Sequence, residues 1–136
     1  MRSVVSDRGP DIEFNTSAYS KADELYRASR FRDALRLFKA SLEADPSDGE
    51  ALFAMGSCYD ALRKPARAAA AYRSAMELLP PDRHPALHFN VGNAFLDLGQ
   101  YAEALEEYKM VPKGHAVWPA ATRNANLALE KLGNGG

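Results

Sequence analysis

The chain has 136 residues, with 17 Lys and Arg against 18 Asp and Glu, so its formal net charge is −1 at pH 7. It is 46% hydrophobic and 26% charged, which is typical of one globular domain. The balanced charge argues against a nucleic-acid binder, which usually carries a concentrated basic surface. No apolar run approaches the length of a membrane span, so we expect no membrane insertion.

Helices are predicted along almost the whole chain. Residues 1–14 are mostly polar, and we expect a flexible leader there. Beyond this leader, apolar residues recur three and four positions apart, which is the spacing of a helix with one buried face. Pro112 and Gly114 shorten the sixth helix, and Pro119 opens the seventh, where its missing N–H removes no helical hydrogen bond. The predicted helices span 16–29, 31–44, 49–62, 65–78, 85–98, 101–111 and 119–132.

A spacing of 34 residues runs through these helices. Ala34, Phe38 and Pro46 recur 34 positions later as Ala68, Tyr72 and Pro80. The next recurrence is 36 positions on, because two residues are inserted in the segment 80–84. Periods of this size indicate stacked helical repeats, in which each unit buries its apolar face only against its neighbours.

The repeated pattern resembles the tetratricopeptide repeat, W-x2-L-G-x2-Y…A-x3-F…P. The second unit matches it with Leu52 in the Trp position, then Met55, Gly56, Tyr59, Ala68, Tyr72 and Pro80. The resemblance implies an all-α solenoid of three helix–turn–helix units with a seventh, capping helix. The expected division is a leader at 1–14, one domain at 15–133 with units at 15–48, 49–82 and 85–118, and a frayed tail at 134–136.

Two glycines within helices predict where helices approach each other closely. Gly56 and Gly92 occupy equivalent positions, and glycine inside a helix costs roughly 1 kcal/mol relative to alanine. That cost is reasonable if a neighbouring helix needs the space. We expect the small residues Ala34, Ala68 and Ala104 to face these positions.

The seventh helix is expected to cover the third unit. Its apolar residues form a stripe that the third unit needs, because the end of a solenoid is otherwise exposed. The stripe consists of Ala121, Ala125, Leu127, Ala128, Leu129 and Leu132.

Catalytic and metal-binding patterns are scarce. His84 and His88 are four positions apart, but Pro85 lies between them. His88 also occupies the position at which the repeat usually has a buried aromatic residue, so we predict no metal site. Cys58 lies in the middle of a helix, and as the single cysteine it predicts a buried, inert thiol. No glycine-rich phosphate loop and no paired acid and base are found, so we expect neither a cofactor nor enzymatic activity.

The resemblance implies that the first helix of each unit lines a concave groove. Three aromatic residues, Tyr19, Phe53 and Phe89, share one position of the unit and would form a row along the groove wall. Asn90 and Asn124 share another position, and amides can both donate to and accept from a peptide backbone. The candidate partner-binding residues are Tyr19, Asp23, Tyr26, Arg27, Phe53, Ser57, Asp60, Phe89, Asn90, Asn93, Asp97, Arg123 and Asn124.

A groove of this kind predicts a non-catalytic adaptor or scaffold that binds a protein or peptide partner. Two alternatives remain: a chaperone of the type III secretion translocator kind, or a structural module that self-associates through its open ends. The clamp with which chaperone-binding members of the family grip a C-terminal carboxylate is not expected. The positions of its Lys, Asn and Arg side chains hold Tyr19, Asp23, Ala54, Ala86 and Asn90, and none of these is a cation. The opening segment has no hydrophobic secretory core, so the cytoplasm is the expected compartment.

Overall fold

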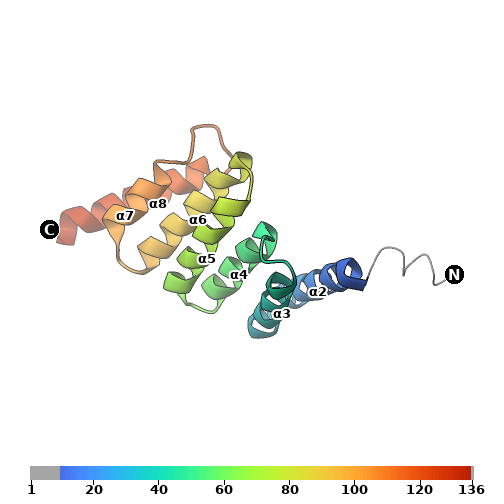
Figure 1. Cartoon of the computed structure of the whole chain (residues 1–136). Helices are drawn as coiled ribbons and strands as arrows, with labels where there is room; N and C mark the ends of the chain where they lie inside the picture. The colour runs from blue at the N-terminus through green and yellow to red at the C-terminus, as the bar shows by residue number, and fades with distance from the viewer. Residues whose placement is uncertain (1–9, 136) are drawn as a thin grey trace.

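The computed structural model describes the backbone of residues 10–135 and the side chains of residues 18–134. Over this part of the chain every regular element is helical, and the helices stack side by side (Figure 1). The prediction of an all-α solenoid is therefore confirmed. The elements are α2 (Pro10–Arg27), α3 (Phe31–Ala44), α4 (Gly49–Ala61), α5 (Pro65–Leu78), the short 3-10 helix η1 (Pro81–Arg83), α6 (His84–Asp97), α7 (Tyr101–Tyr108) and α8 (Trp118–Gly135).

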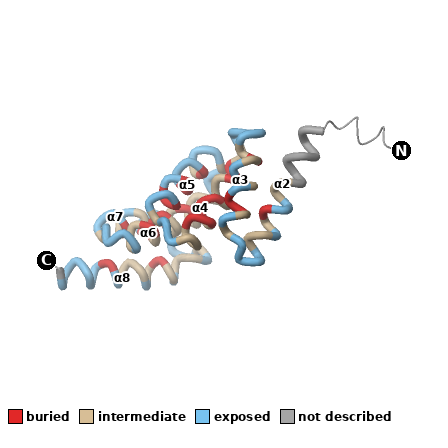
Figure 2. Tube along the Cα trace, turned by 90° about the horizontal axis from the view of Figure 1, so that it is seen from below, coloured by how far each residue is buried: buried red, intermediate tan, exposed pale blue. Residues whose placement is uncertain are grey.

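Each helix packs mainly on the helices that precede and follow it in the chain. This holds from the pair α2 and α3 through to the pair α7 and α8, with a smaller direct contact between α6 and α8. Packing that is mostly between neighbours in the sequence is typical of a repeat array. In such an array the stability comes from each unit and from the interfaces between units. The buried residues accordingly form a band through the stack rather than a central ball (Figure 2).

The middle helices begin and end within a residue or two of their predicted limits, whereas the outer helices differ. Helix α2 begins at Pro10, inside the segment expected to be a leader, and the rest of that leader lies outside the described residues. Helix α7 ends at Tyr108, earlier than predicted, before the turn that contains Pro112. Helix α8 continues to Gly135 and so includes most of the expected tail.

The turn inside each unit uses one residue with left-handed backbone geometry. Ser29, Arg63 and Gly99 have φ angles of 64°, 64° and 75° and occupy equivalent positions. A left-handed residue just after a helix lets the next N–H reach back to an unpaired carbonyl of the last turn. Those hydrogen bonds run from Arg30 to Leu25, from Lys64 to Tyr59 and from Gln100 to Phe95, at 2.8, 2.9 and 2.9 Å.

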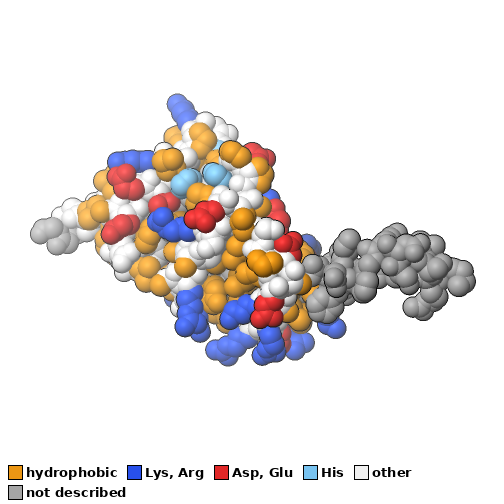
Figure 3. Space-filling view, in the orientation of Figure 1, with side chains coloured by type: hydrophobic (Ala, Val, Ile, Leu, Met, Phe, Trp, Pro, Cys, Tyr) orange, Lys and Arg blue, Asp and Glu red, His pale blue; other side chains and the backbone are white. Residues whose placement is uncertain are grey.

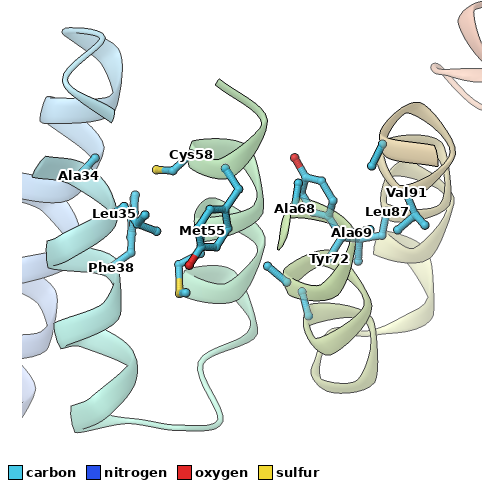
Figure 4. Close-up of a cluster of buried hydrophobic side chains, with 14 of the residues drawn as sticks. Ala34, Leu35, Phe38, Met55, Cys58, Ala68, Ala69, Tyr72, Leu87 and Val91 are labelled. Carbon is cyan, nitrogen blue, oxygen red and sulfur yellow. The ribbon is translucent and has the colours of Figure 1, made fainter. Parts of the chain in front are cut away.

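The core lies between successive helices. Figure 4 shows Leu35 and Phe38 of α3 beside Met55 and Cys58 of α4, with Tyr72 of α5 on the far side of α4. Phe38 and Tyr72 are each 1% exposed although both are large, so they fill most of the space between their neighbours. Burying a side chain of this size contributes roughly 1.5–3 kcal/mol.

Two glycines form notches that receive tyrosine rings. A Cβ atom at Gly56 would lie 2.4 Å from the Tyr72 ring, and one at Gly92 would lie 2.6 Å from the Tyr108 ring. The prediction of close approach at these glycines is confirmed. The atoms that need the space belong to the aromatic ring of the second helix in the same unit, although the neighbouring Ala68 and Ala104 are also fully buried.

Helix α8 covers the third unit with alanines and not with leucines. Ala121 and Ala128 are buried, and Ala121 joins a cluster with Ala104, Tyr108 and Val111. The leucine part of the predicted stripe is wrong, because Leu127, Leu129 and Leu132 are 41%, 55% and 40% exposed. The physical reason is position around the helix: Leu127 and Leu129 flank the buried Ala128 and so lie on either side of the face that packs, while Leu132 lies one turn beyond it.

The glycine notches predict that Gly56→Ala and Gly92→Ala destabilise the fold. The added methyl group must displace a buried tyrosine ring, and overpacking of this kind costs about 1–3 kcal/mol. Gly133→Ala is the matched control, since Gly133 is also helical but has nothing within 4 Å of its added Cβ. Urea melts should show a stabilisation of up to about 1 kcal/mol for the control. Equal effects at the three glycines would contradict the notches.

Candidate functional site

The first helices of the three units, α2, α4 and α6, line a hollow on one face of the stack. Its volume is about 410 Å³, and α2, α4, α5 and α6 all contribute side chains to it. We call it the groove hollow; its lining residues are Tyr26, Ser57, Asp60, Ala61, Tyr72 and Asn90. The structure thus brings together four of the predicted partner-binding residues: Tyr26, Ser57, Asp60 and Asn90.

A second hollow adjoins the first and shares Asp60 with it. Its volume is about 470 Å³, and it is lined by Asp60, Arg63, Pro65 and Asp97. We call it the acidic hollow, because two of its three charged residues are carboxylates. Asp97 was also predicted to face the groove, whereas Arg63 was not among the predicted groove residues.

The Tyr72 hydroxyl connects the core to the groove hollow. It donates a hydrogen bond to the Asp60 carboxylate at 2.5 Å, twelve residues back in the chain. Burial raises the pKa of Tyr72 well above its usual range, and the bond to Asp60 raises it further. Burial also raises the pKa of the Asp60 carboxyl, as does the charge of Asp97, while the bond from Tyr72 opposes both effects.

The third unit uses its tyrosine hydroxyl differently. Tyr108 donates to the Asn93 side chain at 2.6 Å, and the Asn124 amide donates to the same oxygen at 2.8 Å. Burial raises the pKa of Tyr108 to about 12. These bonds tie α6, α7 and α8 together. Asn124 therefore pairs with Asn93, and not with the Asn90 that shares its position in the repeat.

The three predicted groove aromatics each pack on an aromatic residue of the second helix in their own unit. The ring centroids of Tyr19 and Phe38 are 5.3 Å apart, and those of Phe53 and Tyr72 are 5.8 Å apart. Phe89 and Tyr108 repeat the arrangement at 6.2 Å. All three pairs join residues 19 positions apart. Tyr19, Phe53 and Phe89 are half-buried, so each presents only part of its ring to a partner.

The other predicted charged residues lie at the surface. Arg27 donates to Asp23 at 2.9 Å across one turn of α2, and its side chain is 78% exposed. Ion pairs this exposed contribute about 0–1 kcal/mol. Arg123 is exposed on α8. Figure 3 shows Lys and Arg side chains gathered along one edge of the molecule, whereas Asp and Glu are more scattered.

One functional candidate was missed by the sequence reasoning. The segment that contains the insertion folds into η1, which brings Arg83 against Glu50 of α4 through two hydrogen bonds and over the Phe53 ring, 5.4 Å from its centroid. Arg83 therefore lies against one of the predicted groove aromatics. The signal that could have found it is the insertion itself, which has no counterpart between the first two units.

The histidines and the cysteine make structural contacts. His88 bonds to Glu107 at 2.9 Å, and Arg73 donates to the same carboxylate at 3.1 Å. Cys58 is fully buried, and burial raises the pKa of its thiol to about 11. Among the described residues no group of three or more His, Cys, Asp or Glu side chains could hold a metal ion. None of the helices described is long and apolar enough to span a membrane.

Comparison with known proteins identifies the family of this chain. A family model for the tetratricopeptide repeat matches residues 19–83 and 61–116. A probable UDP-N-acetylglucosamine–peptide N-acetylglucosaminyltransferase SPINDLY from Hordeum vulgare is 29% identical over 118 residues, which are 87% of this chain and 12% of that protein. The chain thus spans only a small part of that relative.

Solved structures with the same fold include two that hold a peptide. The first tetratricopeptide domain of Spaghetti (RPAP3), bound to the HSP90 peptide SRMEEVD, has a TM-score of 0.77 at 18% identity and covers 89% of this chain and 94% of its own. The Yersinia enterocolitica type III secretion chaperone SycD, in complex with a peptide of the translocator YopD, has a TM-score of 0.73 at 19% identity. The match covers 89% of this chain and 94% of the SycD chain. At these identities the likeness establishes the fold alone.

The buried tyrosine hydroxyls predict a loss of stability in alkali. In the unfolded chain Tyr72 ionises near its usual pKa of about 10. Since its folded pKa is raised, the unfolded state releases its proton first, and the free energy of unfolding falls as pH rises above about 10. Tyr72→Phe should be less stable at neutral pH by about 1 kcal/mol, through loss of the bond to Asp60, yet decline less steeply in alkali.

Urea melts of both proteins across the alkaline range test this expectation. Parallel stability curves for the natural chain and Tyr72→Phe would contradict the assignment of a buried, protonated hydroxyl to Tyr72.

Proposed function

This chain belongs to the tetratricopeptide repeat family, and on that premise we propose that it is an adaptor that holds a segment of a partner protein in its groove hollow. The observation that supports this most strongly is the hollow itself, because α2, α4 and α6 contribute Tyr26, Asp60 and Asn90 to one depression. Groove binding of a short segment relies on a preformed surface with a few polar groups that fix its orientation.

The hollow offers the chemistry that a polypeptide needs. Asn90 and Ser57 supply donors and acceptors for peptide groups, while the half-buried ring of Tyr26 supplies apolar contact. Tyr72 is held by its neighbours and by Asp60, so this part of the wall is fixed before a partner arrives. A preformed wall lowers the entropy that binding must offset.

The adaptor proposal does not extend to the activities of the relatives. The Lys, Asn and Arg positions of the carboxylate clamp hold Tyr19, Asp23, Ala54, Ala86 and Asn90, so the chain lacks the positive charges to bind a peptide like SRMEEVD in that way. The alternative of a translocator chaperone is supported by the fold that this chain shares with SycD, and binding of a translocator-like protein would test it. We propose no transferase activity, and for localisation the cytoplasm remains our expectation.

Filling the groove hollow should abolish peptide binding. Asn90→Trp places a large ring in the depression, and Glu43→Trp adds the same ring on an exposed position of α3, outside both hollows. Peptides selected from a random displayed library against the natural chain provide the probes. We expect Asn90→Trp to weaken their binding at least about tenfold and Glu43→Trp to leave it unchanged. Binding that survives Asn90→Trp and is lost in Glu43→Trp would place the site elsewhere.

Self-association is the second candidate, and the exposed leucines of α8 favour it. Leu127, Leu129 and Leu132 are large apolar side chains left exposed on the second half of α8, where a second copy of the chain can cover them. If a second copy covers them, Leu129→Glu should lower the sedimentation coefficient of a concentrated sample without lowering its melting temperature. A natural chain that sediments as a monomer would contradict this candidate.

A further inference from the structure

We infer that the groove selects a basic partner, with the acidic hollow receiving a Lys or Arg side chain of the segment held in the adjoining groove hollow. This inference rests on the proposed function and specifies the chemistry of its ligand. The two hollows share Asp60, so a segment lying along Tyr26 and Asn90 passes directly beside the acidic hollow.

The two carboxylates of the acidic hollow have unused capacity. Asp60 receives one described hydrogen bond, from Tyr72, although a carboxylate can accept several. Asp97 receives no hydrogen bond and makes no ion pair among the described side chains, and it is exposed. By contrast, Asp23 is paired with Arg27, and Glu50 with Arg83, so these acids are already matched. The unmatched negative charge of the groove face is therefore concentrated at Asp60 and Asp97.

Two carboxylates that line one hollow favour a cation between them. Asp60 and Asp97 both line the acidic hollow, and the charge of Asp97 adds to burial in raising the pKa of Asp60. A Lys or Arg side chain placed there would relieve this repulsion and gain charge-assisted hydrogen bonds. As pH falls through the raised pKa of Asp60, this attraction should weaken.

Arg63 is the opposing charge, and its position limits its effect. It lines the acidic hollow but is exposed and forms no described ion pair with either carboxylate. Water and salt screen Arg63 and Asp97, which are both exposed, more than they screen the half-buried Asp60. The three charged residues of the hollow sum to −1, so a cationic side chain still meets net attraction, and an acidic one meets two carboxylates.

The remaining walls suit the stem of a basic side chain. Lys and Arg bury their methylene groups along apolar surface while their charged heads reach polar groups. Pro65 lines the acidic hollow, and Tyr26 and Ala61 line the groove hollow beside it. An extended segment can therefore rest on these walls while its cation reaches Asp60 and Asp97.

The test uses the full chain and three matched peptide sets on an array. One set carries Lys and Arg at varied positions, the second replaces them with Gln, and the third replaces them with Glu. Asp60→Asn keeps an oxygen for the Tyr72 hydroxyl, and Asp97→Asn changes an exposed residue, so both variants should fold, which a thermal melt confirms. Arg63→Gln is the control of opposite charge from the same hollow.

We expect the basic set to bind best, Asp60→Asn and Asp97→Asn each to weaken it by roughly tenfold, and Arg63→Gln to strengthen it or leave it unchanged. Neutral or acidic peptides that bind as tightly, with binding lost in Asn90→Trp, would overturn this inference and leave the groove function standing. If no peptide of any set binds in a manner sensitive to Asn90→Trp, the proposed function fails, and this inference fails with it.

Discussion

A tyrosine ring seated in a glycine notch is the contact on which the rest of this structure depends. In the second unit the Tyr72 ring occupies the space that a side chain at Gly56 would fill, and in the third unit Tyr108 does the same at Gly92. The notch sets how closely the two helices of a unit approach. Because each unit stacks on the next, that distance is carried through the array.

The same ring also determines the chemistry of the groove. A phenol that crosses between the helices of one unit has its hydroxyl on the far side, where Tyr72 reaches Asp60. The carboxylate is thereby held half-buried at the point where the two hollows meet. In the third unit the hydroxyl reaches Asn93, and the site becomes a junction with α8. The Tyr72 ring thus packs in the core, while its hydroxyl positions Asp60 at the binding surface.

The repeat spacing predicted the architecture because helical repeats are local. Each helix contacts mainly its sequence neighbours, so a period of 34 residues and the notch glycines were sufficient to predict the stacked helices. The groove residues Tyr26, Asp60 and Asn90 were found in the same way, from their position in the unit. Features that occur in only one unit could not be predicted from the repeat.

Three features show where that reasoning ended. The direction of the Tyr72 hydroxyl depends on the ring's seat at Gly56, which sequence patterns do not describe. The exposure of Leu129 depends on which face of α8 packs on the third unit, and the predicted stripe included residues on both sides of that face. Arg83 reaches Glu50 and Phe53 only because an insertion folds into η1, and an insertion breaks the repeat that the prediction relied on.

A direct map of ligand contact tests the central claim, that the face built around Tyr72 and Asp60 holds a polypeptide segment. The ¹⁵N–¹H spectrum of the full chain would be followed while an unlabelled peptide of mixed Lys and apolar residues is added. We predict that the largest shifts fall on Ser57, Asp60, Asn90 and Asp97, with α3 residues such as Glu43 unchanged. Shifts confined to α3 or to the second half of α8, with the groove residues unmoved, would contradict the account.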